Sequence, residues 1–126
     1  MIITKKTDYP APIFSDSGEV IQEFLGIQAG AVQSHSLARV TIGPGKSSLP
    51  HFHKLSDESY LILSGTATLE INGVSFSLQP WEAVLIEPMD VHQIFNHGDE
   101  DLVFLAACVP AWQPDDSFDA EVNNPE

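Results

Sequence analysis

Short alternating segments separated by turn residues constrain the fold of this chain most strongly. Residues 66–71 and 74–78 each alternate apolar and polar side chains, and Asn72 and Gly73 separate them. Asn-Gly is a strong signal for a two-residue hairpin turn, because both residues tolerate a positive φ. Other short apolar segments follow at intervals of about 8 to 12 residues, and no long window shows a helical period. The sequence therefore predicts an all-β sandwich or barrel.

The length and the apolar content are those of one compact domain. The chain has 126 residues, 43% of them apolar, which suffices for one hydrophobic core. We expect an N-terminal arm over residues 1–20, one β-barrel domain over residues 21–110, and an acidic, proline-containing tail over residues 111–126. Because acidic runs prefer water, we predict that the tail is a solvated end, and packing around a partner subunit is the alternative. Its acidic residues are Asp115, Asp116, Asp119, Glu121 and Glu126.

The charge balance argues against nucleic acid and anionic membranes as partners. The formal net charge is −13, and such a surface repels polyanions. No apolar run reaches the roughly 18 residues of a membrane span, and no secretory signal is recognisable, so we predict a cytoplasmic location. The single cysteine, Cys108, lies in an apolar run and has no partner for an internal disulfide. We expect a buried small side chain there rather than a nucleophile.

Two histidines and a glutamate point to a metal site. Strand geometry puts His51 and His53 on the same face, close enough to share one ion. If the turn over residues 54–57 closes a hairpin, Glu58 comes back beside them. Imidazole nitrogens and a carboxylate oxygen suit Mn, Fe, Co, Ni, Cu or Zn, and such a set leaves coordination positions open. His92 becomes a fourth ligand if its strand pairs across the same barrel.

The spacing of these residues resembles the first motif of the cupin superfamily. That motif consists of glycine, five residues, His-x-His, three or four residues, glutamate, six residues and glycine. The chain matches it at every spacing, with Gly45, His51, His53, Glu58 and Gly65. The resemblance extends from Leu37 to Val109, which is most of the chain.

The second motif of the superfamily is matched in part. His92 and Asn96 occupy its histidine and asparagine positions, and we expect Asn96 to form hydrogen bonds rather than to bind metal. Trp81, Glu87 and Met89 stand where the family has glycine, proline and glycine. Glycine supplies a positive φ at such turns. We therefore expect Trp81 and Met89 to follow another backbone route or to accept strain.

The resemblance implies a cupin-type double-stranded β-helix, a jelly-roll barrel, with one divalent transition metal ion at its centre. The family's ligands carry over onto His51, His53, Glu58 and His92. The first functional hypothesis is a metal-dependent enzyme, of the oxygenase or isomerase type or a lyase, acting on a small organic molecule chelated to the metal. A non-catalytic cupin that binds or senses a small ligand is the alternative, and a structural metal is a third. The residues do not distinguish Fe, Mn, Ni, Zn, Co and Cu.

Tyr60 and Glu58 are the candidate catalytic residues. Tyr60 follows Glu58 by two positions and should also point into the barrel, where its hydroxyl could donate a proton or be satisfied in the core. Glu58 could loosen from the metal and accept a proton. Arg39, the only arginine, could form a structural ion pair or orient a substrate carboxylate.

A homodimer is expected from the resemblance, because small cupins commonly pair through edge strands. The N-terminal arm and the segment around Trp112 could supply the contacts. Trp81 and Trp112 are both large and amphipathic, so we expect them to pack in the core or in an interface rather than to line a pocket.

Overall fold

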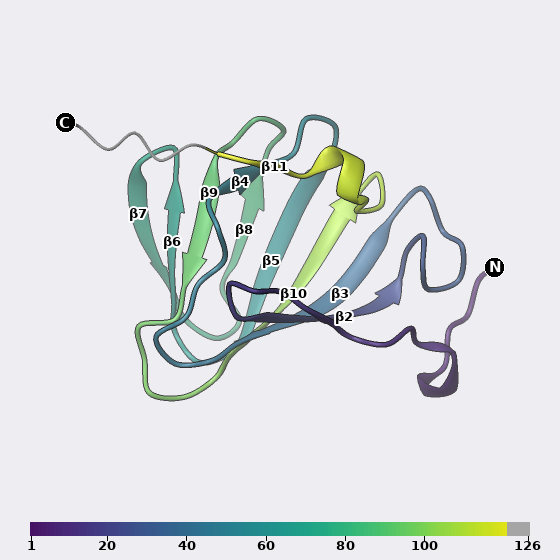
Figure 1. Ribbon diagram of the computed structural model, residues 1–126, viewed down its shortest axis with the longest axis horizontal. Helices are drawn as coiled ribbons and strands as arrows, with labels where there is room; N and C mark the ends of the chain where they lie inside the picture. Colours follow the sequence, from purple (N-terminus) through teal and green to yellow (C-terminus); the bar gives the residue numbers. More distant parts are fainter. Residues whose placement is uncertain (121–126) are drawn as a thin grey trace.

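The computed structural model describes residues 1–120, so Glu121 and Glu126 of the acidic tail lie outside the described residues. Short strands and two single-turn 3₁₀ helices make up the described chain (Figure 1). The elements are η1 (Lys6–Asp8), β1 (Ile13–Phe14), β2 (Glu19–Leu25), β3 (Ser36–Ile42), β4 (His51–Phe52), β5 (Asp57–Ser64), β6 (Ala67–Ile71), β7 (Val74–Leu78), β8 (Ala83–Ile86), β9 (His92–Phe95), β10 (Leu102–Val109), η2 (Pro114–Asp116) and β11 (Phe118–Asp119). Among residues 1–120, no helix is both long and apolar enough to cross a bilayer.

Two antiparallel sheets enclose one core, which confirms the predicted all-β barrel. The six-stranded sheet has the order β1-β2-β3-β10-β5-β8, and the five-stranded sheet has the order β11-β4-β9-β6-β7. Buried apolar side chains from β3, β5, β8 and β10 of the first sheet pack against those from β6 and β9 of the second. Burial of this apolar area is the main favourable contribution to folding.

Strict alternation along the strands decides which side chains enter the barrel. On β10, Leu102, Phe104, Ala106 and Cys108 are buried, while the residues between them are partly exposed. β5 follows the same period, and its buried row begins with two polar residues before it becomes apolar. A side-chain period of two therefore places the polar end of the β5 row at one end of the barrel.

The hairpin between β6 and β7 has the expected turn. Ile71 pairs with Val74 across Asn72 and Gly73, whose φ angles are 49° and 83°. Two successive positive φ angles are the signature of a type I′ turn, whose twist matches that of the flanking strands.

Trp81 and Met89 accept backbone strain where the family has glycine. Their φ angles are 69° and 73°, and their side chains are 75% and 57% exposed. The main-chain N–H of Trp81 donates to the Ile62 carbonyl at 2.7 Å, and that of Met89 donates to the His53 carbonyl at 2.7 Å. These bonds hold two turns against the strands of the site. Trp81 had been expected to pack in the core or in an interface, and its exposure shows that the core alternative is wrong.

The C-terminal segment is not a solvated end. β11 pairs with β4, with Phe118 opposite Phe52, and the two rings stack at 5.4 Å between centroids. Asp116 is only 4% exposed. Figure 1 shows η2 and β11, in yellow, crossing the end of the barrel beside β4. The prediction of a solvated tail is therefore wrong for this segment, because Phe118 and the Asp116 carboxylate both have partners in the barrel.

Candidate metal centre

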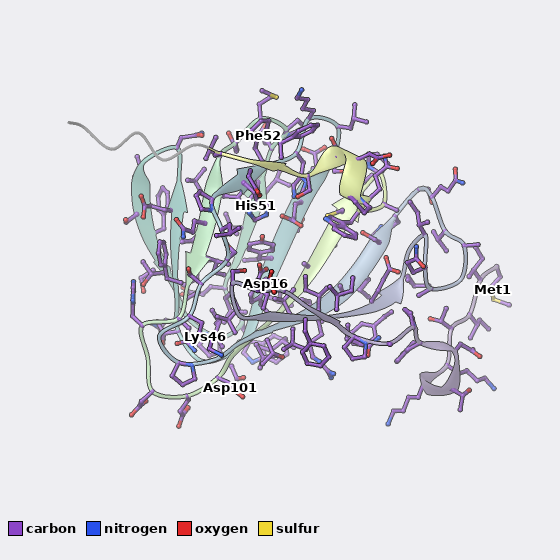
Figure 2. All side chains as sticks on the ribbon, viewed as in Figure 1. Met1, Asp16, Lys46, His51, Phe52 and Asp101 are labelled. Carbon is purple, nitrogen blue, oxygen red and sulfur yellow. The ribbon has the colours of Figure 1, made fainter. Side chains whose placement is uncertain are left out.

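Three separate segments bring four donor side chains to one end of the barrel. His51 lies on β4, His53 follows it directly, Glu58 lies on β5 and His92 begins β9. His51 pairs with His92 in the sheet register, and Glu58 comes from the facing sheet. One donor atom from each residue lies within 4.8 Å of the others. Figure 2 shows His51 directed into the barrel and Phe52, its neighbour on β4, directed away from it.

Each histidine is held in the same tautomer by a main-chain carbonyl. The Nδ1 atoms of His51, His53 and His92 lie 2.8, 2.8 and 2.9 Å from carbonyl oxygens. The carbonyls belong to Leu49, Asp116 and Asp90, respectively. Because a carbonyl oxygen can only accept, each Nδ1 must carry the hydrogen. In the neutral imidazole, each Nε2 therefore keeps a free lone pair, which is the state that a metal ion requires.

Within residues 1–120, three buried polar atoms at this point have no hydrogen-bond partner. They are His53 Nε2, His92 Nε2 and Glu58 Oε1, in residues that are at most 6% exposed. Glu58 Oε1 lies 3.4 Å from His53 Nε2 and 3.2 Å from His92 Nε2. Neighbouring donors on one transition metal are separated by roughly 3 to 3.5 Å. Because buried polar atoms are rarely left unpaired, these residues fit a metal ion.

The second oxygen of Glu58 has a partner that the sequence did not reveal. Cys108 pairs with Glu58 in the register of β10 and β5, and its Sγ donates to Glu58 Oε2 at 3.1 Å. Burial and the Glu58 charge both raise the pKa of the Cys108 thiol. Cys108 is therefore buried and protonated, as expected. Residues 102–109 are apolar at every position, so the sequence held no signal for the contact of Cys108 with the site.

Asp116 is the other residue that sequence reasoning missed. Its carbonyl accepts from His53, as described above, and its carboxylate accepts the main-chain N–H groups of Lys54, Leu55 and Ser56 at 2.9 to 3.1 Å. Burial alone would raise the pKa of this carboxyl, but these N–H groups outweigh it and lower the pKa. Asp116 thus fixes the turn between His53 and Glu58, two of the four candidate metal ligands.

Electrostatics at the centre favour a neutral His51 and an ionised Glu58. Burial, with His92 nearby, lowers the pKa of His51 to about 4. Burial opposes ionisation of Glu58, but His53 and His92 outweigh it and lower the pKa of the carboxyl. Burial likewise opposes charge on His53, yet the Glu58 carboxylate raises its pKa. An anionic carboxylate beside imidazoles is a donor set that attracts a cation.

A pocket of about 650 Å³ reaches this centre and is lined by His51, His53 and Glu58. Tyr60 also lines it and is 4% exposed. The Tyr60 ring packs against Phe104 at 4.7 Å between centroids. Burial, followed by the Glu58 charge, raises the pKa of the Tyr60 hydroxyl well above its usual value. Tyr60 therefore keeps its proton at neutral pH and points into the barrel beside Glu58.

Other candidate residues have clear places in the structure. Asn96 is 1% exposed and bonds the main chain through its Nδ2 and Oδ1 atoms, so its expected hydrogen-bonding role is correct. Arg39 is exposed and lies 5.7 Å above the Phe24 ring. It does not line the pocket that reaches the candidate metal ligands. The hypothesis that Arg39 orients a substrate carboxylate is therefore wrong. Trp112 is half-buried and lines the pocket, whereas packing in the core or in an interface had been expected.

Comparisons with known proteins agree with the fold. A family model described as "Cupin domain" matches residues 38–108. An uncharacterized protein of Methanocaldococcus jannaschii is 30% identical over 92% of this chain and 93% of its own length. The oxalate-binding protein of Thermotoga maritima is 30% identical over 73% of this chain and 77% of its own length.

The solved structures include a protein of Klebsiella pneumoniae with a double-stranded β-helix domain. It superimposes with a TM-score of 0.73 at 20% identity and covers 86% of this chain and 89% of that chain. Such a likeness supports the jelly-roll architecture. Since the family model spans more than half of the chain and a near full-length relative reaches 30% identity, this protein belongs to the cupin superfamily.

Proposed function

We propose that this cupin is a metal-dependent enzyme that acts on a small organic molecule chelated to a divalent transition metal, with oxygenase- or isomerase-type chemistry. His51, His53, Glu58 and His92 would hold the ion. The observation that carries the proposal is the set of unpartnered donor atoms at the end of a pocket large enough for a substrate. A purely structural metal would not need such a pocket.

The metal, when bound, would supply Lewis-acid or oxygen-activating chemistry. The chain's own residues would position the substrate and move protons. Tyr60 lines the pocket and keeps its proton, so its hydroxyl can donate a hydrogen bond to a substrate oxygen. Cys108 holds the distal oxygen of Glu58 and limits how far that carboxylate can rotate. The apolar walls around Tyr60 and Phe104 would exclude water from the reacting atoms.

A non-catalytic binding or sensing role is the second candidate. The similarity to a relative named as an oxalate-binding protein favours it. The two candidates differ in one measurable way, since an enzyme converts its ligand and a binding protein releases it unchanged.

The test combines metal analysis with a turnover assay. Protein purified without added metal should contain about one divalent ion per chain, and His51→Ala and His53→Ala should lose it while keeping the fold by circular dichroism. A mixed panel of small hydroxy acids, diketones and phenols, followed by mass spectrometry, should reveal a product that Tyr60→Phe fails to form while it still binds metal. Tight binding of a panel member without product would support the sensing role and reject the enzyme.

We further propose that two chains pair as a homodimer in the cytoplasm. β1 is the outer strand of the six-stranded sheet, and Ile13 and Phe14 on it are 45% and 74% exposed. Unpaired edge strands with apolar side chains favour association. Sedimentation at micromolar concentration should give about twice the monomer mass, and a clean monomer would reject the pairing. Cell fractionation tests the location.

A further inference from the structure

In the part of the chain that the structure describes, the charged side chains that line the pocket are all carboxylates, if the histidines are left aside. Besides Glu58, the carboxylates that line it are those of Glu19, Glu23, Asp115 and Asp119. Within residues 1–120, neither lysine nor arginine lines this pocket. This is unusual for a site that would take a multiply charged anion, because proteins generally hold carboxylates and phosphates with Arg or Lys.

The basic side chains of the protein are held elsewhere. Arg39 lies over Phe24 on the outside of the six-stranded sheet, and Lys54 lies 4.3 Å above the Phe118 ring. Phe118 stacks on Phe52, which points away from the barrel (Figure 2). The other basic residues, Lys5, Lys6 and Lys46, are exposed and also absent from the pocket lining. An anionic ligand would therefore find no cation in the pocket except the metal.

Glu19 brings one carboxylate into the pocket itself. It opens β2, is half-buried, and accepts a long hydrogen bond of 3.4 Å from Ser17 Oγ. Burial, with a smaller contribution from the Glu58 charge, raises the pKa of this carboxyl. Glu19 thus places a poorly solvated carboxyl group in the same pocket as Glu58, and an anionic ligand group beside these two carboxyl groups would be unfavourable.

Much of the remaining wall is apolar. Ile21, Ala38, Val40, Phe104 and Ala106 line the pocket, and its polar lining side chains include Ser36, Gln113 and Ser117. The apolar side chains can bury an aliphatic or aromatic ligand body.

We propose that this pocket selects metal-chelating ligands whose body beyond the chelating group is apolar and either uncharged or cationic, and that Glu19 is the residue that discriminates against dicarboxylates and phosphorylated sugars. This inference rests on the proposed function, because it assumes an accessible metal. It separates the chain from its relative named for oxalate binding, since oxalate is a dianion without an apolar body.

A charge series on one chelating group tests the inference. The probes are benzohydroxamate and its 4-carboxy and 4-aminomethyl derivatives, which share the metal-binding head and differ in the charge of the ring substituent. Their affinities for the cobalt(II)-loaded protein are read from the change in the visible spectrum of the metal, with oxalate as a fourth probe. The 4-carboxy compound should bind about three- to tenfold more weakly than the parent, and the 4-aminomethyl compound at least as tightly.

Variants then assign the discrimination. Glu19→Gln should reduce the difference between the 4-carboxy compound and the parent to less than about twofold. Glu100→Gln, which removes the same charge from an exposed loop residue that does not line the pocket, should leave the difference unchanged. If both variants reduce the difference in affinity between the 4-carboxy compound and the parent equally, Glu19 is not the discriminating residue.

Each outcome separates this inference from the proposed function. Tighter binding of the 4-carboxy compound or of oxalate than of the parent in the unmodified protein would overturn the inference and leave the metal-dependent activity standing. Absence of any spectral change with all four probes would mean that the metal is closed to ligands. In that case the proposed function fails, and the inference fails with it.

Discussion

Replacing Asp116 by alanine should destabilise the protein by about 2 to 5 kcal/mol. The Asp116 carboxylate accepts N–H groups from Lys54, Leu55 and Ser56. Lys54 and Leu55 are exposed, so water can replace the carboxylate there, at a loss of about 0.5 to 1 kcal/mol for each bond. Ser56 is 3% exposed, and its N–H would be left buried and unpaired, at about 1 to 3 kcal/mol. The sum is a substantial part of the free energy of unfolding of a small domain, which is about 5 to 15 kcal/mol.

Urea unfolding followed by tryptophan fluorescence measures this loss. Asp115→Ala is the matched control, because Asp115 is the exposed neighbour in η2 and should change the free energy of unfolding by less than about 0.5 kcal/mol. Asp116→Asn should lie between the two, since its single amide oxygen can replace only part of the acceptor. If Asp116→Ala unfolds within about 0.5 kcal/mol of the unmodified protein, the segment does not anchor the turn and the reasoning is wrong.

The pH dependence gives an independent check on the same residue. The pKa of Asp116 is lower in the folded protein than its ordinary value, because the three N–H groups that it accepts favour the charged carboxylate and outweigh its burial. A depressed folded pKa means that the stabilisation is complete above the unfolded value and is lost as the pH falls through the folded one. The stability difference between the unmodified protein and Asp116→Ala should therefore be constant above about pH 5 and shrink in more acidic solution. A difference that grew towards low pH would contradict this assignment.

Three further changes have defined outcomes. Removing the metal with a chelator should lower the melting temperature of the unmodified protein and leave that of His53→Ala unchanged, because a ligand stabilises only the state that binds it. Cys108→Ala should destabilise the metal-free protein by about 1 to 2 kcal/mol through loss of the bond to Glu58, and Cys108→Ser should restore most of this in urea unfolding; equal values for the two would reject the role of the bond. Trp81→Gly should stabilise the protein by about 0.5 to 1 kcal/mol, because φ is 69° and the side chain is 75% exposed, and a fall in the unfolding midpoint would mean that the indole has a partner.

Local patterns in the sequence allowed the prediction of the barrel and of candidate metal ligands at one end of it. Alternation gave the strands, and it placed Glu58 and Tyr60 on one inward face before any pairing was known. Of the two outcomes expected at Trp81 and Met89, another backbone route or acceptance of strain, the structure shows the second, with φ angles of 69° and 73°. The convergence of His92 with the first three donors depended on the family resemblance, since no local signal fixes which strand pairs with which.

Long-range contacts account for what the sequence did not reveal. The hydrogen bond between His53 and Asp116 joins residues that are 63 positions apart. A run of aspartates with few apolar residues is normally solvated, so its composition concealed both the buried carboxylate and the Phe118 anchor. The contact between Cys108 and Glu58 required the exact pairing of β10 with β5, which alternation alone leaves free to slip by two residues.

The C-terminal segment links the orientation of the donor residues to the shape of the pocket. The Asp116 carbonyl fixes the tautomer of His53, while the neighbouring Gln113, Asp115 and Ser117 line the pocket that reaches His53 and Glu58. Main-chain hydrogen bonds from η2 and β11 thus position both the candidate metal ligand His53 and the residues that line the pocket. Displacing this segment to admit a bulky ligand would break the bonds that hold His53. We therefore infer that ligands must fit the pocket as it stands, which makes the charge and polarity of its present lining the basis of selectivity.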